Sequence, residues 1–479
     1  MLALLVLGPI AALLLLNLPW RNVPRWALNA SVLSLAFAEL FVAVSLPALL
    51  SGAGLPLLDQ LHFGLVADDL TRIMLAAIGL VLGAATLVGQ DSISGDRKHR
   101  LFCSLLLVSL TGMNATVLLS DFFSMYVFLE VTAVASFILI AQDRALLAIE
   151  GAFRYLILSA VAAVFMLAAC GLLVLSAGGT SFDAVRAALS SGTEHGVLAR
   201  VALGVFVLGM FIKGGVVPFH GWLPGAYGSA PSAVSVLLSG IVTKVSGIYA
   251  LVRIVHSVYV PDAKLSMVLL VLGTVSILVG AIAALGQTDM KRMLAYSSIS
   301  QVGYIVLALG AGGELGVVAA SFHLFNHAIF KSLLFVDAAA IESRAGTSEL
   351  SRLGGIGGKM PVTGATATLG MLSAAGIPPF AGFFSKLLII VALFKSDHTY
   401  FAVVAVLASL LTLGYFLSMQ RQAFFGKPAE GLEDVTEATS GFLVPALVLA
   451  TITVFAGVLF PFLLDSSFSF LLLSKSLPW

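Results

Sequence analysis

Apolar runs separated by short polar segments repeat along the whole chain. A run of about 20 apolar residues has the length needed to cross a hydrocarbon core roughly 30 Å thick as a helix, and the pattern predicts about 14 such helices. The first run has no basic leader and no small-residue cleavage site, so we interpret it as a retained span. The helices are expected near residues 1–18, 23–50, 66–89, 101–119, 121–141, 151–176, 199–219, 230–255, 265–286, 293–311, 314–340, 360–394 (broken), 400–420 and 441–464.

Composition supports an all-α, polytopic membrane protein. Of the 479 residues, 59% are hydrophobic and 10% are charged, whereas a soluble domain carries about 25% charged residues. The net charge of +1 excludes a basic surface for nucleic acid. Two cysteines, Cys103 and Cys170, are too few for a disulfide scaffold, an iron–sulfur cluster or a cysteine zinc site.

Basic residues predict the orientation. Lys and Arg concentrate in cytoplasmic loops, and the loops after helices 1, 3, 5, 9, 11 and 13 hold 14 of them, against 6 in the opposite loops and the C-terminus. Both termini are therefore expected on the non-cytoplasmic side of a prokaryotic plasma membrane. Arg72, near the start of helix 3, can snorkel to the interface beside Asp68 and Asp69.

Four lysines, however, lie deep inside predicted spans: Lys213, Lys244, Lys331 and Lys386. A charged Lys at mid-membrane costs at least about 2.5–3.5 kcal/mol, which an inert helix bundle has no reason to carry. Unlike Arg, a buried Lys can release its proton near neutral pH. We interpret the four as candidate proton carriers; the alternative is that each snorkels or pairs structurally.

Two acidic residues also lie within spans. Glu130 is near the centre of helix 5 and needs a partner, for which Lys213 in helix 7 is the candidate. Opening such a pair would release a proton from the lysine. Glu39, toward the middle of helix 2, has no equally obvious counterpart, and the sequence leaves open whether it is structural or functional.

Helices 7 and 12 contain breakers at membrane depth. Both share a P-F-x-G core, at Pro218–Gly221 and Pro379–Gly382, with Lys213 before the first break and Lys386 after the second. Freed backbone groups are tolerated in a membrane only where protein or water satisfies them. Paired interrupted helices indicate a transport pathway built from repeats. The lysine lies before one break and after the other, which suits an inverted pair.

Helix 11 adds a polar face. His323, His327 and Lys331 recur at i, i+4 and i+8, so they lie along one side of the helix. Such a ladder can pass protons through water, because histidine titrates near neutral pH. Two histidines on one face of one helix cannot hold opposite sides of a haem iron, so a haem site is disfavoured.

Four segments carry a family resemblance: KGGVVPFHGWLPGAYGSAPSAVSVLLSGIVTK, KRMLAYSSISQVGYI, FHLFNHAIFKSLLF and GIPPFAGFFSKL. Over about residues 65–420 the chain resembles the antiporter-like subunits shared by respiratory complex I, Mrp cation/proton antiporters and membrane-bound group 4 nickel–iron hydrogenases. The resemblance implies 14 helices with two inverted five-helix repeats, helices 4–8 and 9–13. The chain is then divided into helices 1–3 (residues 1–100), the first repeat (101–255), the second repeat (256–425) and helix 14 (426–479).

The resemblance also implies roles for individual residues. Proton translocation is implied for Glu130, Lys213, Lys244, His323, His327, Lys331 and Lys386. Gly225 departs from the family, which usually has aspartate after Trp-Leu-Pro, and this could alter access from the cytoplasm. The chain also lacks the long lateral helix of the largest such subunit.

The expected mechanism is a charge relay along these groups, driven by a neighbouring subunit. No flavin, nicotinamide or phosphate-binding signature occurs, so we expect no cofactor or metal in this chain. Other membrane subunits and a peripheral redox arm are the expected partners, which makes the chain a non-redox subunit of an oxidoreductase or an antiporter. The coupled ion, H⁺ alone or H⁺ with Na⁺, and the parent complex stay open.

Two alternatives use the same helices differently. A self-contained secondary transporter could place a small solute at the breaks, although the deep polar groups are titratable and spread from helix 5 to helix 12. A structural anchor for a redox arm could retain lysines without function. Solute uptake by the isolated protein would favour the first, and unchanged pumping after lysine substitution the second.

Overall fold

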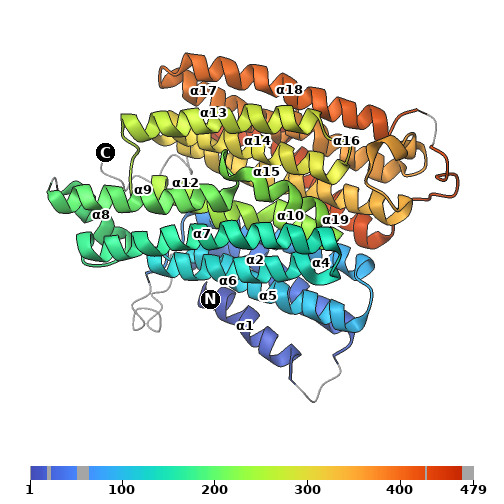
Figure 1. Ribbon diagram of the computed structural model, residues 1–479, viewed down its shortest axis with the longest axis horizontal. Helices are drawn as coiled ribbons and strands as arrows, with labels where there is room; N and C mark the ends of the chain where they lie inside the picture. Colours follow the sequence, from blue (N-terminus) through green and yellow to red (C-terminus); the bar gives the residue numbers. More distant parts are fainter. Residues whose placement is uncertain (1, 19–22, 51–63, 192, 427–428, 467–479) are drawn as a thin grey trace. The chain divides into compact units, whose positions relative to one another are not determined.

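The computed structural model describes residues 2–18, 23–50, 64–191, 193–426 and 429–466, with the backbone alone at 46–50 and 461–466. In this part the chain is helical apart from short connections, and it forms two compact units, Met1–Tyr259 and Val260–Trp479 (Figure 1). The predicted all-α, polytopic membrane architecture is confirmed.

The first unit contains the helices of predicted spans 1–8 and one short additional helix. They are α1 (Leu2–Leu16), α2 (Arg25–Leu50), α4 (Asp69–Ser92), α5 (Asp96–Leu118), α6 (Phe122–Ile140), α7 (Leu146–Ala177), α8 (Phe182–Ser190), α9 (Glu194–Gly214), α10 (Leu223–Ser229), α11 (Ser232–Leu237) and α12 (Ala250–Ser257). Two π-helical segments, Leu238–Val242 and Lys244–Tyr249, lie between α11 and α12. The short helix α8 was not predicted.

The second unit contains the helices of predicted spans 9–14. They are α13 (Ala263–Leu285), α14 (Met290–Ala311), α15 (Gly313–Ala345), α16 (Pro361–Ala375), α17 (Ala381–Lys395), α18 (Thr399–Ala423) and α19 (Ser440–Ser466). Helices α13 and α14 run side by side, because Gly273 of α13 lets the backbone of α14 approach closely at Gly303 (Figure 1).

Twelve helical stretches in the described residues are long and apolar enough to cross a membrane. The two other predicted spans are α1, which has 15 residues, and predicted helix 12, which is divided into α16 and α17 of 15 residues each. Predicted helix 7, which is not α7, is also broken as predicted, into α9 and α10. Large apolar side chains on α7, such as Val164 at 68% exposure, face outward as a lipid-facing surface requires.

Aspartates begin several spans. Asp68, Asp121, Asp262 and Asp289 each precede a helix and accept a hydrogen bond from the backbone N–H three residues later. Each cap satisfies a donor that the first helical turn leaves unpaired. Asp121, predicted as an interfacial residue, is therefore the N-cap of α6.

Some charges that entered the orientation count are not loop residues. Arg253 is 1% exposed within α12, and Lys291 is 3% exposed and lies 3.0 Å from Glu342. Their positions near helix ends made them indistinguishable from loop cations in the sequence. Arg21, Lys427 and Lys475, which also entered the count, lie outside the described residues.

Candidate functional site

An ion pair joins α6 to α9 in the first unit. The Nζ of Lys213 lies 2.7 Å from Oε1 of Glu130, so the structure pairs the two residues matched from the sequence. Nζ also lies 3.0 Å from the Ser159 hydroxyl of α7. The lysine side chain is 2% exposed and the glutamate side chain 28%. The ammonium group is thus enclosed, whereas the carboxylate keeps partial access from outside.

The helix break holds Lys213 at the end of α9. Gly215 follows with a φ of 68°, the left-handed conformation that terminates helices and favours glycine. Lys213 is in the last helical turn, where unpaired carbonyl groups favour a positive charge. The end of α9 also packs against the π-helical segment that begins at Lys244. The break therefore brings two deep lysines onto directly packed segments.

Lys244 is 1% exposed and its Nζ donates to the carbonyl of Ser239. Among the described residues no carboxylate is placed within ion-pair distance of this lysine. One π-helical segment ends at Val242 and the next begins at Lys244 itself, and both interrupt the regular hydrogen-bond ladder, a feature frequent at functional sites. Lys244 is thus a buried amine held by a backbone carbonyl and without a counter-charge from the described side chains.

Replacing Lys244 by arginine should reduce proton flux by about tenfold or more, since arginine retains its proton at any accessible pH. Flux into vesicles that contain the complete complex is the measurement. Arg292, an exposed cation at the start of α14, offers the matched control, because Arg292→Lys should leave flux unchanged. Near-normal flux with arginine at position 244 would assign Lys244 a structural role.

Helix α15 carries the predicted polar face inside the second unit. His323 and His327 are fully buried, and their ring centroids lie 6.2 Å apart with the planes 17° from parallel. Nδ1 of His323 lies 2.8 Å from the Ser385 hydroxyl of α17. Lys331, also buried, donates to the carbonyl of Leu294 at 2.9 Å and to the Ser297 hydroxyl. The three groups follow one face of a continuous helix.

Lys386 lies beside the second break. Although it follows the break in sequence, its Nζ reaches back to the carbonyls of Ala374 and Ala375, at 2.9 and 3.3 Å. These carbonyls end α16, so the ammonium group of Lys386 sits at the negative end of a half-helix. Gly376, with a φ of 85°, leaves room for the lysine stem: a Cβ there would lie 3.0 Å from Cδ of Lys386. Nζ also lies 4.7 Å from the centroid of the Tyr304 ring.

The two helix breaks therefore have a similar local structure. Each first half-helix ends at a glycine in the left-handed conformation. A buried lysine lies at each break: Lys213 belongs to the last turn of α9, and the amine of Lys386 meets the last carbonyls of α16. His323 contacts Ser385, the residue before Lys386, so the α15 face and the second break are connected. The structure brings Glu130 together with Lys213 and places His323 near Lys386.

The sequence itself decides the family. Residues 120–412, more than half of the chain, match the family of transmembrane proteins described as NADH:quinone oxidoreductase/Mrp antiporter. The chain belongs to this family. The matched range contains all seven residues predicted to carry protons, and the resemblance inferred from the motifs is confirmed.

Relatives include a subunit of an antiporter and a subunit of an oxidoreductase. The chain is 30% identical to a Na⁺/H⁺ antiporter subunit of Alkalihalophilus pseudofirmus over 401 residues, covering 83% of this chain and 81% of the relative. It is 34% identical to an NADH-quinone oxidoreductase subunit of Desulforudis audaxviator over 410 residues, covering 82% and 81%. A chain of the Mrp complex from a Dietzia species superposes with a TM-score of 0.86 at 25% identity, covering 97% and 95%. The protein is thus an antiporter-like membrane subunit.

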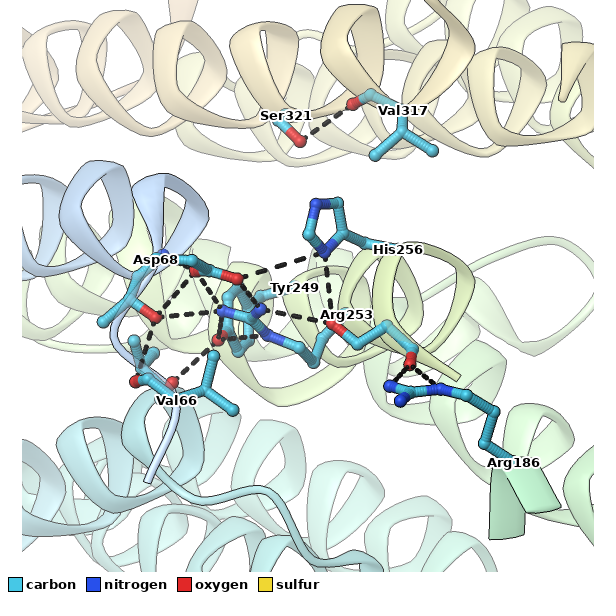
Figure 2. Close-up of polar contacts among 11 residues, drawn as sticks. Val66, Asp68, Arg186, Tyr249, Arg253, His256, Val317 and Ser321 are labelled. Carbon is cyan, nitrogen blue, oxygen red and sulfur yellow. Dashed lines mark hydrogen bonds and ion pairs between the residues drawn. The ribbon is translucent and has the colours of Figure 1, made fainter. Parts of the chain in front are cut away.

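Sequence reasoning missed one polar cluster of this antiporter-like protein. The guanidinium group of Arg253 binds both carboxylate oxygens of Asp68, at 2.9 Å for one of them, and also contacts Tyr249 and Thr71 (Figure 2). His256 points toward the same carboxylate, with Nδ1 4.0 Å from Oδ2. The cluster fastens the start of α4 to the end of α12. A signal existed, an Asp before one span and an Arg inside another, but 185 residues separate them.

The charge of Arg253 favours the carboxylate form of Asp68. Burial acts to raise the pKa of Asp68, but the charge of Arg253 and its hydrogen bonds outweigh burial and hold that pKa below its usual range. A carboxyl with a lowered pKa contributes stability above the pKa of the unfolded chain and loses it as the pH falls through the folded value. The pair is therefore intact at neutral pH.

Replacing Arg253 by leucine should destabilise the protein by about 3 kcal/mol, because Asp68 keeps a partly buried charge without its partner. Thermal unfolding in detergent at neutral pH measures this loss. Arg186→Leu is the matched control: Arg186 binds the carbonyl of Ser257 but is 44% exposed, so its loss should cost about 1 kcal/mol or less. An equal loss of stability in the two variants would show that the Asp68–Arg253 pair stabilises the protein no more than the Arg186 contact does.

Proposed function

We propose that this chain translocates protons across the membrane along its buried titratable groups. In the first unit the route runs from Glu130 through Lys213 to Lys244. In the second unit it follows the α15 face and leaves from Lys386. The observation that carries the proposal is the enclosed Glu130–Lys213 pair, since a charged pair at membrane depth is expensive and marks ion pathways.

The pair acts as the gate of the route. While Glu130 is charged, its carboxylate stabilises the proton on Lys213. A change of charge in a neighbouring subunit can draw the partly exposed carboxylate away, and Lys213 then lies in an enclosed site beside the Ser159 hydroxyl. Under those conditions the ammonium group gives its proton to the next amine along the route, and α9 packs directly against the segment that begins at Lys244.

The second unit provides a chain of proton acceptors. His323, His327 and Lys331 are spaced by one helical turn each, and water can bridge such a step. Lys386 terminates the chain at the carbonyl end of α16, where it is held by two backbone oxygens and by no carboxylate among the described residues. An amine held in this way can both accept and release a proton.

The finer architecture that we infer has 14 spans and two inverted five-helix repeats, with both termini on the non-cytoplasmic side. Matching loop contacts support the repeat. In the first unit Phe122 N–H donates to the Thr180 carbonyl, and in the second Met290 N–H donates to that of Ser348. Asp121 and Asp289 hold corresponding positions, as N-caps that each accept a side-chain hydroxyl from the facing loop.

We further propose that the chain works within a multisubunit complex of a prokaryotic plasma membrane. Its relatives are subunits of a Na⁺/H⁺ antiporter and of an NADH-quinone oxidoreductase, and its fold is that of a chain in an Mrp complex. A driving redox reaction, where there is one, belongs to partner subunits, because the described residues provide no cofactor-binding motif.

Purification of the chain from its native membrane tests this proposal. The co-purifying proteins identify the parent complex, and the reconstituted complex should acidify or alkalinise vesicles when its driving reaction runs. Isolation as a single chain that takes up a small solute would instead support a self-contained transporter.

A further inference from the structure

A buried carboxyl group lies outside the proposed proton route. Glu39 of α2 is 1% exposed, and its Oε1 accepts a hydrogen bond from the side-chain amide of Asn114 in α5 at 2.5 Å. The same amide nitrogen donates to the carbonyl of Leu5 in α1 at 2.7 Å. Gly79 of α4 packs against α2 beside Glu39. Four helices therefore meet around one carboxyl–amide contact.

No described cation neutralises Glu39. Helix α1 carries no titratable side chain in Leu2–Leu16. On α4, Arg72 donates to the Asp69 carboxylate and to the carbonyl of Ala43, and Asp91 lies near the far end of the helix. The titratable residues of α5 cluster in its first two turns, from Asp96 to Cys103, whereas Asn114 lies near the other end of that helix. Arg25 of α2 itself pairs with Asp96.

An uncompensated carboxylate at this depth is costly, and such groups become neutral instead of staying charged. Two buried oxygen atoms indicate how Glu39 becomes neutral. Oε2 of Glu39 and Oδ1 of Asn114 are both buried, and neither has a hydrogen-bond partner among the described residues. A carboxylic acid and a primary amide can bind each other reciprocally, with the amide N–H donating to one oxygen and the acid O–H donating back. One proton on Oε2 supplies the donor that Oδ1 lacks.

A metal cation fits less well. Hard cations take about six oxygen ligands, whereas this position offers two unpartnered oxygens and one carbonyl, Leu5, that already accepts a hydrogen bond. Two unpartnered oxygens are enough to bind one proton and too few to bind a metal cation.

We propose that Glu39 and Asn114 form a proton-binding site in the N-terminal helices, separate from the Glu130–Lys213 route. The bound proton joins α2 to α5 by a second hydrogen bond. Loss of that proton would leave a carboxylate facing the Asn114 carbonyl oxygen and would loosen the contact among α1, α2 and α5. The site thus ties the packing of the N-terminal helices to its protonation.

Infrared spectroscopy of the purified complex tests the site without measuring proton flux, so its result is independent of the proposed function. The carbonyl stretch of a protonated carboxyl should be present in the wild type and lost in Glu39→Gln. Glutamine can keep both hydrogen bonds to Asn114, so the melting temperature should be unchanged. Glu130→Gln and Asp337→Asn, which alter other deep carboxyls, should leave the Glu39 band in place.

A second variant keeps the test valid if Glu39→Gln fails to fold. Asn114→Leu removes the amide partner and should shift the Glu39 band to higher frequency without abolishing it. Identical spectra of wild type and Glu39→Gln in this region would show that Glu39 is a carboxylate and overturn the proposal. A Glu39 band that disappears when NaCl replaces KCl at constant pH would also overturn it, because a sodium ion would then occupy the site.

Discussion

Replacing Lys213 by alanine should lower proton flux through the complex by about 10²-fold, the scale of losing a positioned proton-transfer group. The substitution removes the amine that receives the proton and leaves Glu130 without its counter-charge. Glu130→Gln should have a comparable effect, because the glutamine cannot alternate between holding and releasing the Lys213 ammonium group. Both are measured as proton flux into inverted vesicles during turnover.

The Ser159 hydroxyl supplies the control for this pair. Ser159 also contacts the ammonium group, at 3.0 Å, but it carries no charge, so Ser159→Ala should reduce flux only slightly. The amount of each subunit in the membranes, measured in parallel, separates lost pumping from lost assembly. Wild-type flux in either Lys213→Ala or Glu130→Gln would remove the pair from the route.

The second large effect is expected at the exit. Lys386→Ala should also lower flux by about 10²-fold, because Lys386 is the last amine of the route and stands alone at the carbonyl end of α16 among the described side chains. His327→Ala should lower flux by about tenfold or less, since water can bridge one missing turn between His323 and Lys331. The ratio of the two effects, measured in the same vesicles, is the readout.

Lys395 provides a matched control for the exit, because it lies at the exposed end of the same helix, α17. Lys395→Ala should leave flux intact. If His327→Ala abolishes flux while Lys386→Ala preserves it, the route leaves through α15 and Lys386 is a structural charge beside the break.

The sequence predicted the spans, the two breaks and the deep lysines, for a physical reason. A membrane requires long apolar runs, so hydropathy marks the spanning helices, and any charge or proline within a run stands out. The same contrast made Lys213 the candidate partner of Glu130, and the structure pairs the two residues. The family motifs then implied the two inverted five-helix repeats.

Contacts between distant segments were beyond such reasoning. Arg253 was counted as a loop residue, because a cation near a helix end has the same local pattern whether it meets water or Asp68. The π-helical turns around Lys244 were not predicted either, since a change of hydrogen-bond register leaves the apolar pattern unchanged. The partner of Glu39, Asn114, is an uncharged residue 75 positions away and gave no signal.

Proton translocation by this chain is tested most directly by the number of protons moved per turnover of the complex. The Lys213→Ala and Lys386→Ala substitutions are combined in this chain, and proton flux and the driving reaction are recorded together in reconstituted vesicles. If protons cross through this chain, fewer protons move per turnover while the complex remains assembled. An unchanged number of protons per turnover would contradict translocation by this chain, because the protons would then cross the membrane without passing through it.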